Sequence, residues 1–270
     1  MKKDEAMISP SERMIAEKDG AIGWMVFNNP ERRNAISLDM WQAIPPILDA
    51  FEQDSEIRVI VLKGAGDQAF ISGADISQFE QQRSSAETVA QYDKIAETAG
   101  ARLQESRKPT IAMIHGFCIG GGLGVALQCD LRIAADNARF AVPAAKLGLG
   151  YRWGGVKKLV DTVGPAYAKE IFFTARQFDA AEALAMGLVN RVLPASELEP
   201  YVRRYCAIMA ENAPLTIEAV KGVIQELQKP VAEIDRKRCE ALVARCFQSE
   251  DYIEGRRAFM EKRKPVFAGK

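Results

Sequence analysis

The chain has 270 residues, 48% of them hydrophobic, and its 36 basic side chains balance 36 acidic ones. This length suits one large α/β core, and the zero net charge disfavours nucleic acid or a membrane surface as a main partner. Five cysteines without metal-ligand spacing predict reduced thiols, and no apolar N-terminal run is present, so we expect a cytoplasmic protein with no metal site.

The first half alternates strand-like and helix-like segments. Short β-branched runs predict strands at 21–27, 57–63, 110–115 and 131–135. Residues 38–54 have a helical period, which Pro45 and Pro46 are expected to break or kink. Residues 78–107 are polar and helix-compatible, and 78–85 is either a cover over a site or part of a surface helix.

The second half is mainly helical. Helices are predicted at 156–163, 166–174 and 180–186, with Asp179 as N-cap and Gly187 as C-cap. A short strand at 188–192 precedes Pro194, where further helices begin. We therefore divide the chain into a core domain, 1–195, and a C-terminal helical region, 196–270, which packs on the core or on a neighbouring subunit.

Three consecutive glycines, 120–122, join a predicted strand to an apolar helix. Glycines there allow close approach of a ligand, and the new helix presents free N–H groups and its positive dipole end. Such a turn suits developing negative charge, for example on a thioester oxygen that becomes an enolate. By itself such a turn is weak evidence for a binding site, because many glycine turns only allow close packing.

Several stretches together resemble the crotonase (enoyl-CoA hydratase/isomerase) superfamily over nearly the whole chain. They are NNPERRNAI (28–36), AFISGADI (69–76), the segment 116–150, FTARQFDAAEALAMGLVNRVLP (173–194) and FMEKRKPVF (259–267). The resemblance implies a spiral of ββα units with a C-terminal helical trimerisation region, assembled as a trimer or hexamer. It also implies an acyl-CoA substrate, with coenzyme A as part of the substrate and no other cofactor.

The resemblance also assigns site residues. The backbone N–H groups of Ala74 and Gly121 would form the oxyanion hole that stabilises a thioester enolate. Coenzyme A would lie along Arg33–Ile36, which includes Ala35, and along Ser72–Ile76, which includes Asp75. Lys262, near the C-terminus, would reach the CoA phosphates, from an adjacent subunit if not its own.

The sequence departs from the hydratases at two positions. Their two glutamates correspond here to Gly124 and Ala144. Adding water to an acyl-CoA double bond needs an acid and a base, each contributing about 10²–10⁴ in rate. Glycine and alanine transfer no proton, so ordinary hydration is expected to be very slow.

The loop 147–155 carries Tyr151 and Arg152 where hydratases have small pocket residues, and it resembles the loop of methylmalonyl-CoA decarboxylases. Tyr151 would orient or protonate the substrate and Arg152 would bind its carboxylate, although those relatives have a histidine where this chain has Ala74. Alternatively, Tyr151 fills space and Arg152 pairs with a neighbouring acid.

Three functions therefore stay open. The first is a malonyl-type acyl-CoA decarboxylase, the second an enoyl-CoA hydratase or isomerase whose acid and base come from residues not yet recognised. The third is a catalytically silent CoA-binding subunit.

Overall fold

The structure is a computed structural model that describes residues 5–75 and 86–270. Within these residues the larger sheet has the strand order β1-β2-β3-β4-β6-β8-β11, antiparallel from β1 to β3 and parallel from β3 onward. Its strands are β1 (Glu5–Ser11), β2 (Met14–Asp19), β3 (Ile22–Phe27), β4 (Val59–Gly64), β6 (Thr110–Ile114), β8 (Leu131–Ala135) and β11 (Arg191–Leu193).

A smaller sheet lies beside it, with the order β10-β9-β7-β5. Its strands are β5 (Ala69–Ile71), β7 (Phe117–Ile119), β9 (Arg139–Ala141) and β10 (Phe178–Asp179). Successive strands alternate between the two sheets and are followed by a helix: β4, β5 and α3 (Ala86–Gln104), then β6, β7 and α4 (Gly121–Gln128), then β8, β9 and α5 (Trp153–Thr174). These repeated ββα units confirm the expected α/β spiral.

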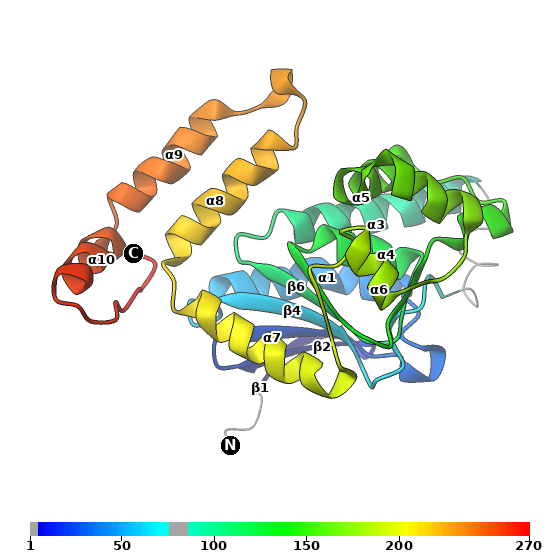
Figure 1. Cartoon of the computed structure of the whole chain (residues 1–270), viewed down its shortest axis with the longest axis horizontal. Helices are drawn as coiled ribbons and strands as arrows, with labels where there is room; N and C mark the ends of the chain where they lie inside the picture. The colour runs from blue at the N-terminus through cyan, green and yellow to red at the C-terminus, as the bar shows by residue number, and fades with distance from the viewer. Residues whose placement is uncertain (1–4, 76–85) are drawn as a thin grey trace.

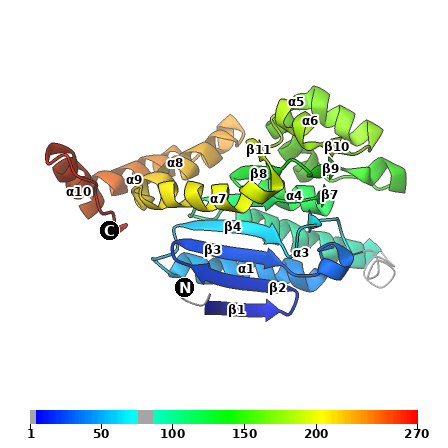
Figure 2. The ribbon, with the colours of Figure 1, turned by 60° about the horizontal axis from the view of Figure 1, so that its bottom comes forward.

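Helices cover both faces of the larger sheet, as Figure 2 shows. On β4, Ile60 and Leu62 point into the core shared with α1 (Leu38–Gln53), whereas Val59 and Val61 point into the core shared with α7 (Ala195–Ala210). This alternation is the period of two that a strand buried on both faces requires. The sheet is therefore fixed from both sides.

Most expected elements are present, with local differences. Helix α1 runs through Pro45 and Pro46 without a break, because its apolar face is buried against the sheet. Helix α5 is divided at Gly164, whose φ is 76°, as the two predicted helices required. The last core strand begins at Arg191 instead of residue 188, because the N–H of Leu188 bonds back to the end of α6 (Ala180–Ala185).

The C-terminal helices α8 (Pro214–Leu227), α9 (Arg236–Phe247) and α10 (Glu250–Met260) extend away from the sheets (Figure 1). Polar contacts tie α8 to the core: Lys221 pairs with Asp130 at 2.8 Å and donates to the Lys108 carbonyl at 3.0 Å, and Gln225 Nε2 donates to the Gln104 carbonyl at 2.5 Å. Among the described residues, no helix has the length and apolar character that crossing a bilayer needs.

Candidate active site

The loop after β5 is held against the segment that precedes α1. Ile36 donates its N–H to the Gly73 carbonyl at 2.8 Å, and its own carbonyl accepts from the Asp75 N–H at 3.0 Å. An ion pair of 2.9 Å between Arg32 and the buried Asp75 adds to these bonds. The two backbone bonds flank Ala74, whose own N–H has no backbone acceptor in the described structure.

The N-terminus of α4 lies directly against Ala74. Gly120, with φ of 53°, donates its N–H to the Ala141 carbonyl at 2.8 Å and turns the chain into the helix. A Cβ placed on Gly121 would lie 3.9 Å from the Ala74 nitrogen. As the first residue of α4, Gly121 has an N–H without a partner in the helix. The two N–H groups named from the sequence therefore lie close together, at the positive end of the α4 dipole.

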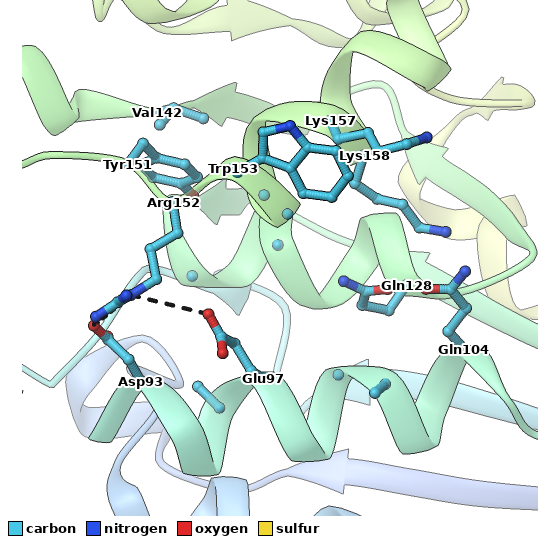
Figure 3. A pocket seen from close by; sticks show the side chains of 18 of the residues that line it. Asp93, Glu97, Gln104, Gln128, Val142, Tyr151, Arg152, Trp153, Lys157 and Lys158 are labelled. Atoms are coloured by element: carbon cyan, nitrogen blue, oxygen red, sulfur yellow. Dashed lines mark hydrogen bonds and ion pairs between the residues drawn. The ribbon is translucent and has the colours of Figure 1, made fainter. Parts of the chain in front are cut away.

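This point opens into a pocket of about 1200 Å³. Its walls come from loop 72–74, α3, α4 and the segment 142–158, and the end of α8 lies at its far side. Figure 3 shows Tyr151 and Arg152 at one end of the pocket, and Gln104, Gln128 and the lysines of α5 at the other. The pocket is large compared with small-molecule sites of about 300–1000 Å³.

The two positions where the sequence departs from the hydratases both line this pocket. A Cβ built on Gly124 meets no atom within 4 Å, so the space beside α4 is open there. Ala144 lies in the 3₁₀ turn Pro143–Leu147 and is 6% exposed. Neither residue offers a group that transfers a proton to a molecule in the pocket.

Tyr151 lines the pocket from the segment before α5. Its ring packs edge-on against Phe172, with 4.9 Å between ring centroids, and burial raises the pKa of its hydroxyl. No hydrogen bond to that hydroxyl is found among the described residues, and a phenol with a raised pKa is protonated at neutral pH.

Arg152 bridges the pocket to α3. Its Nε and Nη2 donate to one carboxylate oxygen of Asp93 at 2.8 and 2.6 Å, and its Nε lies 3.9 Å from Glu97 (Figure 3). The hydrogen bond to Asp93 raises the pKa of Arg152. Of the two predictions for Arg152, the structure therefore realises the pairing with a neighbouring acid.

Helix α3 brings protonatable side chains to the pocket that sequence reasoning missed. Asp93 and Glu97, one turn apart, lie on its pocket face, and the largely buried Tyr92 also lines the pocket. Ala99 and Leu103 are buried in the core. The sequence predicted a polar, helix-compatible segment here, but a polar helix face looks the same whether it meets bulk water or a pocket.

Of the other residues predicted to contact coenzyme A, some line the pocket and some do not. Ser72 lines the pocket, and its N–H donates to the Arg33 carbonyl at 3.1 Å. Arg33 is exposed and Ala35 is buried behind the loop, and neither lines the pocket; nor does Asp75, which holds Arg32. Ile76 and the predicted cover, 78–85, lie outside the described residues.

Lys262 follows α10, the helix that lies farthest from the sheets (Figure 1). It does not line the pocket of its own chain, because α8 ends at the pocket and α9 then runs away from it toward α10. A contact between Lys262 and a ligand would therefore need a second subunit.

The repeated ββα units, with a pocket at the N-terminus of α4, define an enzyme of the crotonase type. A family model described as Enoyl-CoA hydratase/isomerase matches residues 17–270, and the chain belongs to this family.

Individual relatives extend over nearly the full length. The chain is 35% identical over 254 residues to a short-chain-enoyl-CoA hydratase of Clostridium acetobutylicum, covering 93% of this chain and 95% of that protein. It is 34% identical to a carnitinyl-CoA dehydratase of Escherichia coli K12, covering 96% and 100%. A solved structure of an enoyl-CoA hydratase/isomerase family protein from Hyphomonas neptunium superposes with a TM-score of 0.92 at 33% identity, covering 97% and 100%.

Proposed function

We propose that this chain acts on acyl-CoA thioesters by stabilising an enolate with the N–H groups of Ala74 and Gly121. The observation that carries the proposal is the 3.9 Å between the Ala74 nitrogen and the Cβ position of Gly121, at the start of a helix and inside a large pocket. Fixed backbone donors at a helix N-terminus stabilise a developing oxyanion without reorganisation. Their removal in other enzymes typically costs about 10²–10³ in rate.

The reaction we favour is decarboxylation of a malonyl-type thioester. The bond between the α-carbon and its carboxylate breaks, the electron pair moves into the enolate, and carbon dioxide leaves. The α-carbon then takes the proton of the Tyr151 hydroxyl, which solvent restores. This sequence needs no general base, in keeping with Gly124 and Ala144 in the pocket wall. The Nη1 of Arg152, which Asp93 does not use, is our candidate for orienting the carboxylate.

Hydration is the second candidate, because Glu97 points into the same end of the pocket (Figure 3). Its side chain is 66% exposed, and its closest described charge partner is Arg152 at 3.9 Å. In this reaction Glu97 takes a proton from water as the oxygen bonds to the β-carbon, and Tyr151 gives a proton to the α-carbon. The relatives whose names include hydratase favour the same reaction.

The deciding experiment incubates the protein with methylmalonyl-CoA and crotonyl-CoA and follows both by mass spectrometry. Loss of carbon dioxide from methylmalonyl-CoA would establish the decarboxylase, and gain of water by crotonyl-CoA would establish the hydratase. Retention of both esters without conversion would leave a silent CoA-binding subunit and refute the enzymatic proposal.

Two matched variants separate the roles of the residues. We expect Tyr151→Phe to lower turnover by about 10²–10⁴ in either reaction, since it removes the proton donor and leaves the ring packing. Glu97→Gln should lower hydration to a similar degree and leave decarboxylation nearly unchanged. Affinity for a non-reacting acyl-CoA, measured by calorimetry, should stay within about twofold of wild type for both variants.

The proposal extends to binding and assembly. We place the acyl group in the pocket and the rest of coenzyme A outside it, along Arg33, Ala35, Ser72, Asp75 and Ile76, of which Ser72 lines the pocket wall. Its phosphates would lie near Lys262 of an adjacent subunit. Exposed apolar side chains on α8, α9 and α10 support a trimer or a hexamer. All five cysteines are free thiols, which suits a reducing compartment such as the cytoplasm.

A further inference from the structure

The pocket continues well beyond the paired N–H groups. Helix α4 forms its floor from Gly121 to Gln128, a rise of about 10 Å at about 1.5 Å per residue. Small residues line this stretch, including Ala96, Gly100 and Gly124. An acyl chain whose thioester lies at Gly121 therefore has a path along α4 toward Gln128.

Polar side chains surround the far end of this path, where an ordinary fatty acyl chain would place its terminal methyl group. Gln104 at the end of α3, Gln128 at the end of α4 and Lys158 on α5 all line the pocket, and Figure 3 shows them together on the side away from Tyr151. Three separate helices thus bring polar groups to one place.

Lys158 is a half-buried cation that contacts no acid directly among the described residues, although the charges of Asp161 and Asp130 act on it. No ion pair or hydrogen bond of its side chain is found within the described residues, and burial lowers its pKa. The two acids that act on Lys158 are each paired with another lysine: Asp161 with Lys157 at 2.5 Å, and Asp130 with Lys221 at 2.8 Å. Withdrawing an ammonium from water without a partner is costly, so the position favours an incoming anion.

Gln128 beside it also lacks a partner. Its Oε1 is fully buried and has no hydrogen bond in the described structure. Its amide packs over Gly100, with 3.6 Å between Nε2 and the Cβ position of that glycine. An unpaired amide oxygen needs a donor, which a carboxylate does not supply, so the group that Gln128 offers to an anion is the N–H of Nε2.

The other cations at this end are engaged. Lys229 and Arg238 both pair with Glu226, at 2.8 and 2.7 Å. In this part of the described pocket wall, Lys158 is therefore the basic residue that forms no ion pair, and its charge is available to a ligand.

We propose that Lys158 and Gln128 bind a carboxylate at the distal end of the acyl chain, so that the substrates are thioesters of dicarboxylic acids of medium length. The ammonium of Lys158 donates to the distal carboxylate, and the amide N–H of Gln128 donates to its second oxygen. The inference rests on the proposed acyl-CoA function and names its substrate class.

The test compares two non-reacting ligands, octanoyl-CoA and suberyl-CoA, which have the same chain length and differ in a terminal methyl or carboxylate. Full-length wild-type protein should bind suberyl-CoA about 10-fold or more tightly than octanoyl-CoA in calorimetry, the gain typical of a charge-assisted hydrogen bond. Glutaryl-CoA, whose carboxylate is too close to the thioester to reach Lys158, should show no such gain over its methyl counterpart.

Lys158→Met should abolish the preference and leave octanoyl-CoA affinity within about twofold, because the methionine keeps the apolar stem. Lys157→Met, which removes the adjacent lysine that pairs with Asp161, is the matched control and should keep the preference. Lys158→Gln serves if the methionine variant does not fold.

The outcomes separate the two proposals. Equal binding of octanoyl-CoA and suberyl-CoA by wild type, or a preference that survives in both Lys158 variants, overturns the distal carboxylate site and leaves the acyl-CoA function standing. Failure of the wild type to bind either ligand overturns both.

Discussion

Two glycines on α4, Gly122 and Gly124, differ sharply in their surroundings. A Cβ on Gly122 would lie 2.1 Å from the Ile71 carbonyl oxygen, whereas a Cβ on Gly124 meets nothing within 4 Å. Gly124→Ala should therefore raise the free energy of unfolding by about 0.5–1 kcal/mol, the usual difference between glycine and alanine inside a helix. Gly122→Ala, the matched control, should lower it well beyond 1 kcal/mol or so. Urea denaturation measures both, and a destabilised Gly124→Ala would show that the space at α4 is not open.

The sequence was sufficient to predict some of the site residues and not others. Backbone donors depend on a local turn, so the motifs around Ala74 and Gly121 placed both residues at the pocket. Gly124, Ala144 and Tyr151 also line it. Glu97 and Lys158 were missed because their position depends on which way a whole helix faces, and that is decided by packing between elements far apart in the sequence.

At the scale of elements, length and burial decided what was predictable. Strands of the larger sheet from β3 to β8 are five or six residues long and mostly buried, so their β-branched runs were visible. Strands of the smaller sheet have two or three residues, too few for any period to show. Strand β2 alternates buried and half-buried residues and carries charges, so it was missed as well.

The C-terminal end of α1 depends on one lysine. Lys108 donates to the carbonyl oxygens of Phe51 and Asp54, at 2.5 and 2.6 Å, where the last helical carbonyls lack partners within the helix. Lys108→Met should lower the free energy of unfolding by about 1–3 kcal/mol, because these carbonyls lose their donor. Urea denaturation of the variant, beside the exposed-lysine control Lys237→Met, measures the change.

The effect should depend on pH. Burial lowers the pKa of Lys108 to about 8 from its ordinary value of 10.5. Between these values the unfolded chain holds a proton that the folded chain has released, so the contribution of this group to the free energy of unfolding rises with pH. The difference between wild type and Lys108→Met should therefore be larger at about pH 10 than at about pH 7. An equal difference at both pH values would show that Lys108 titrates as an exposed lysine does.

At the scale of the whole molecule, the core is closed and the C-terminal helices are not. The two faces of the larger sheet are covered by α1 and α7, whereas α8, α9 and α10 enclose an apolar groove of about 810 Å³. Among the side chains on this region, Phe247, Phe259 and Met260 are 61%, 82% and 80% exposed. Single exposed apolar residues are ordinary, but a continuous patch of this kind marks a contact surface.

If this surface holds the proposed trimer together, a charge placed in its groove should separate the subunits without unfolding them. Phe259 lines the groove, so Phe259→Glu removes a large apolar contact and buries a carboxylate in any assembly. Light scattering of the wild type should give three or six times the 29.8 kDa of one chain, and the variant should shift toward the single mass with an unchanged far-UV circular dichroism spectrum. Lys237→Glu, on an exposed part of α9 away from the groove, should keep the wild-type mass. A Phe259→Glu protein that stays assembled would place the subunit contacts elsewhere, and Lys262 would then lose its route to a neighbouring pocket.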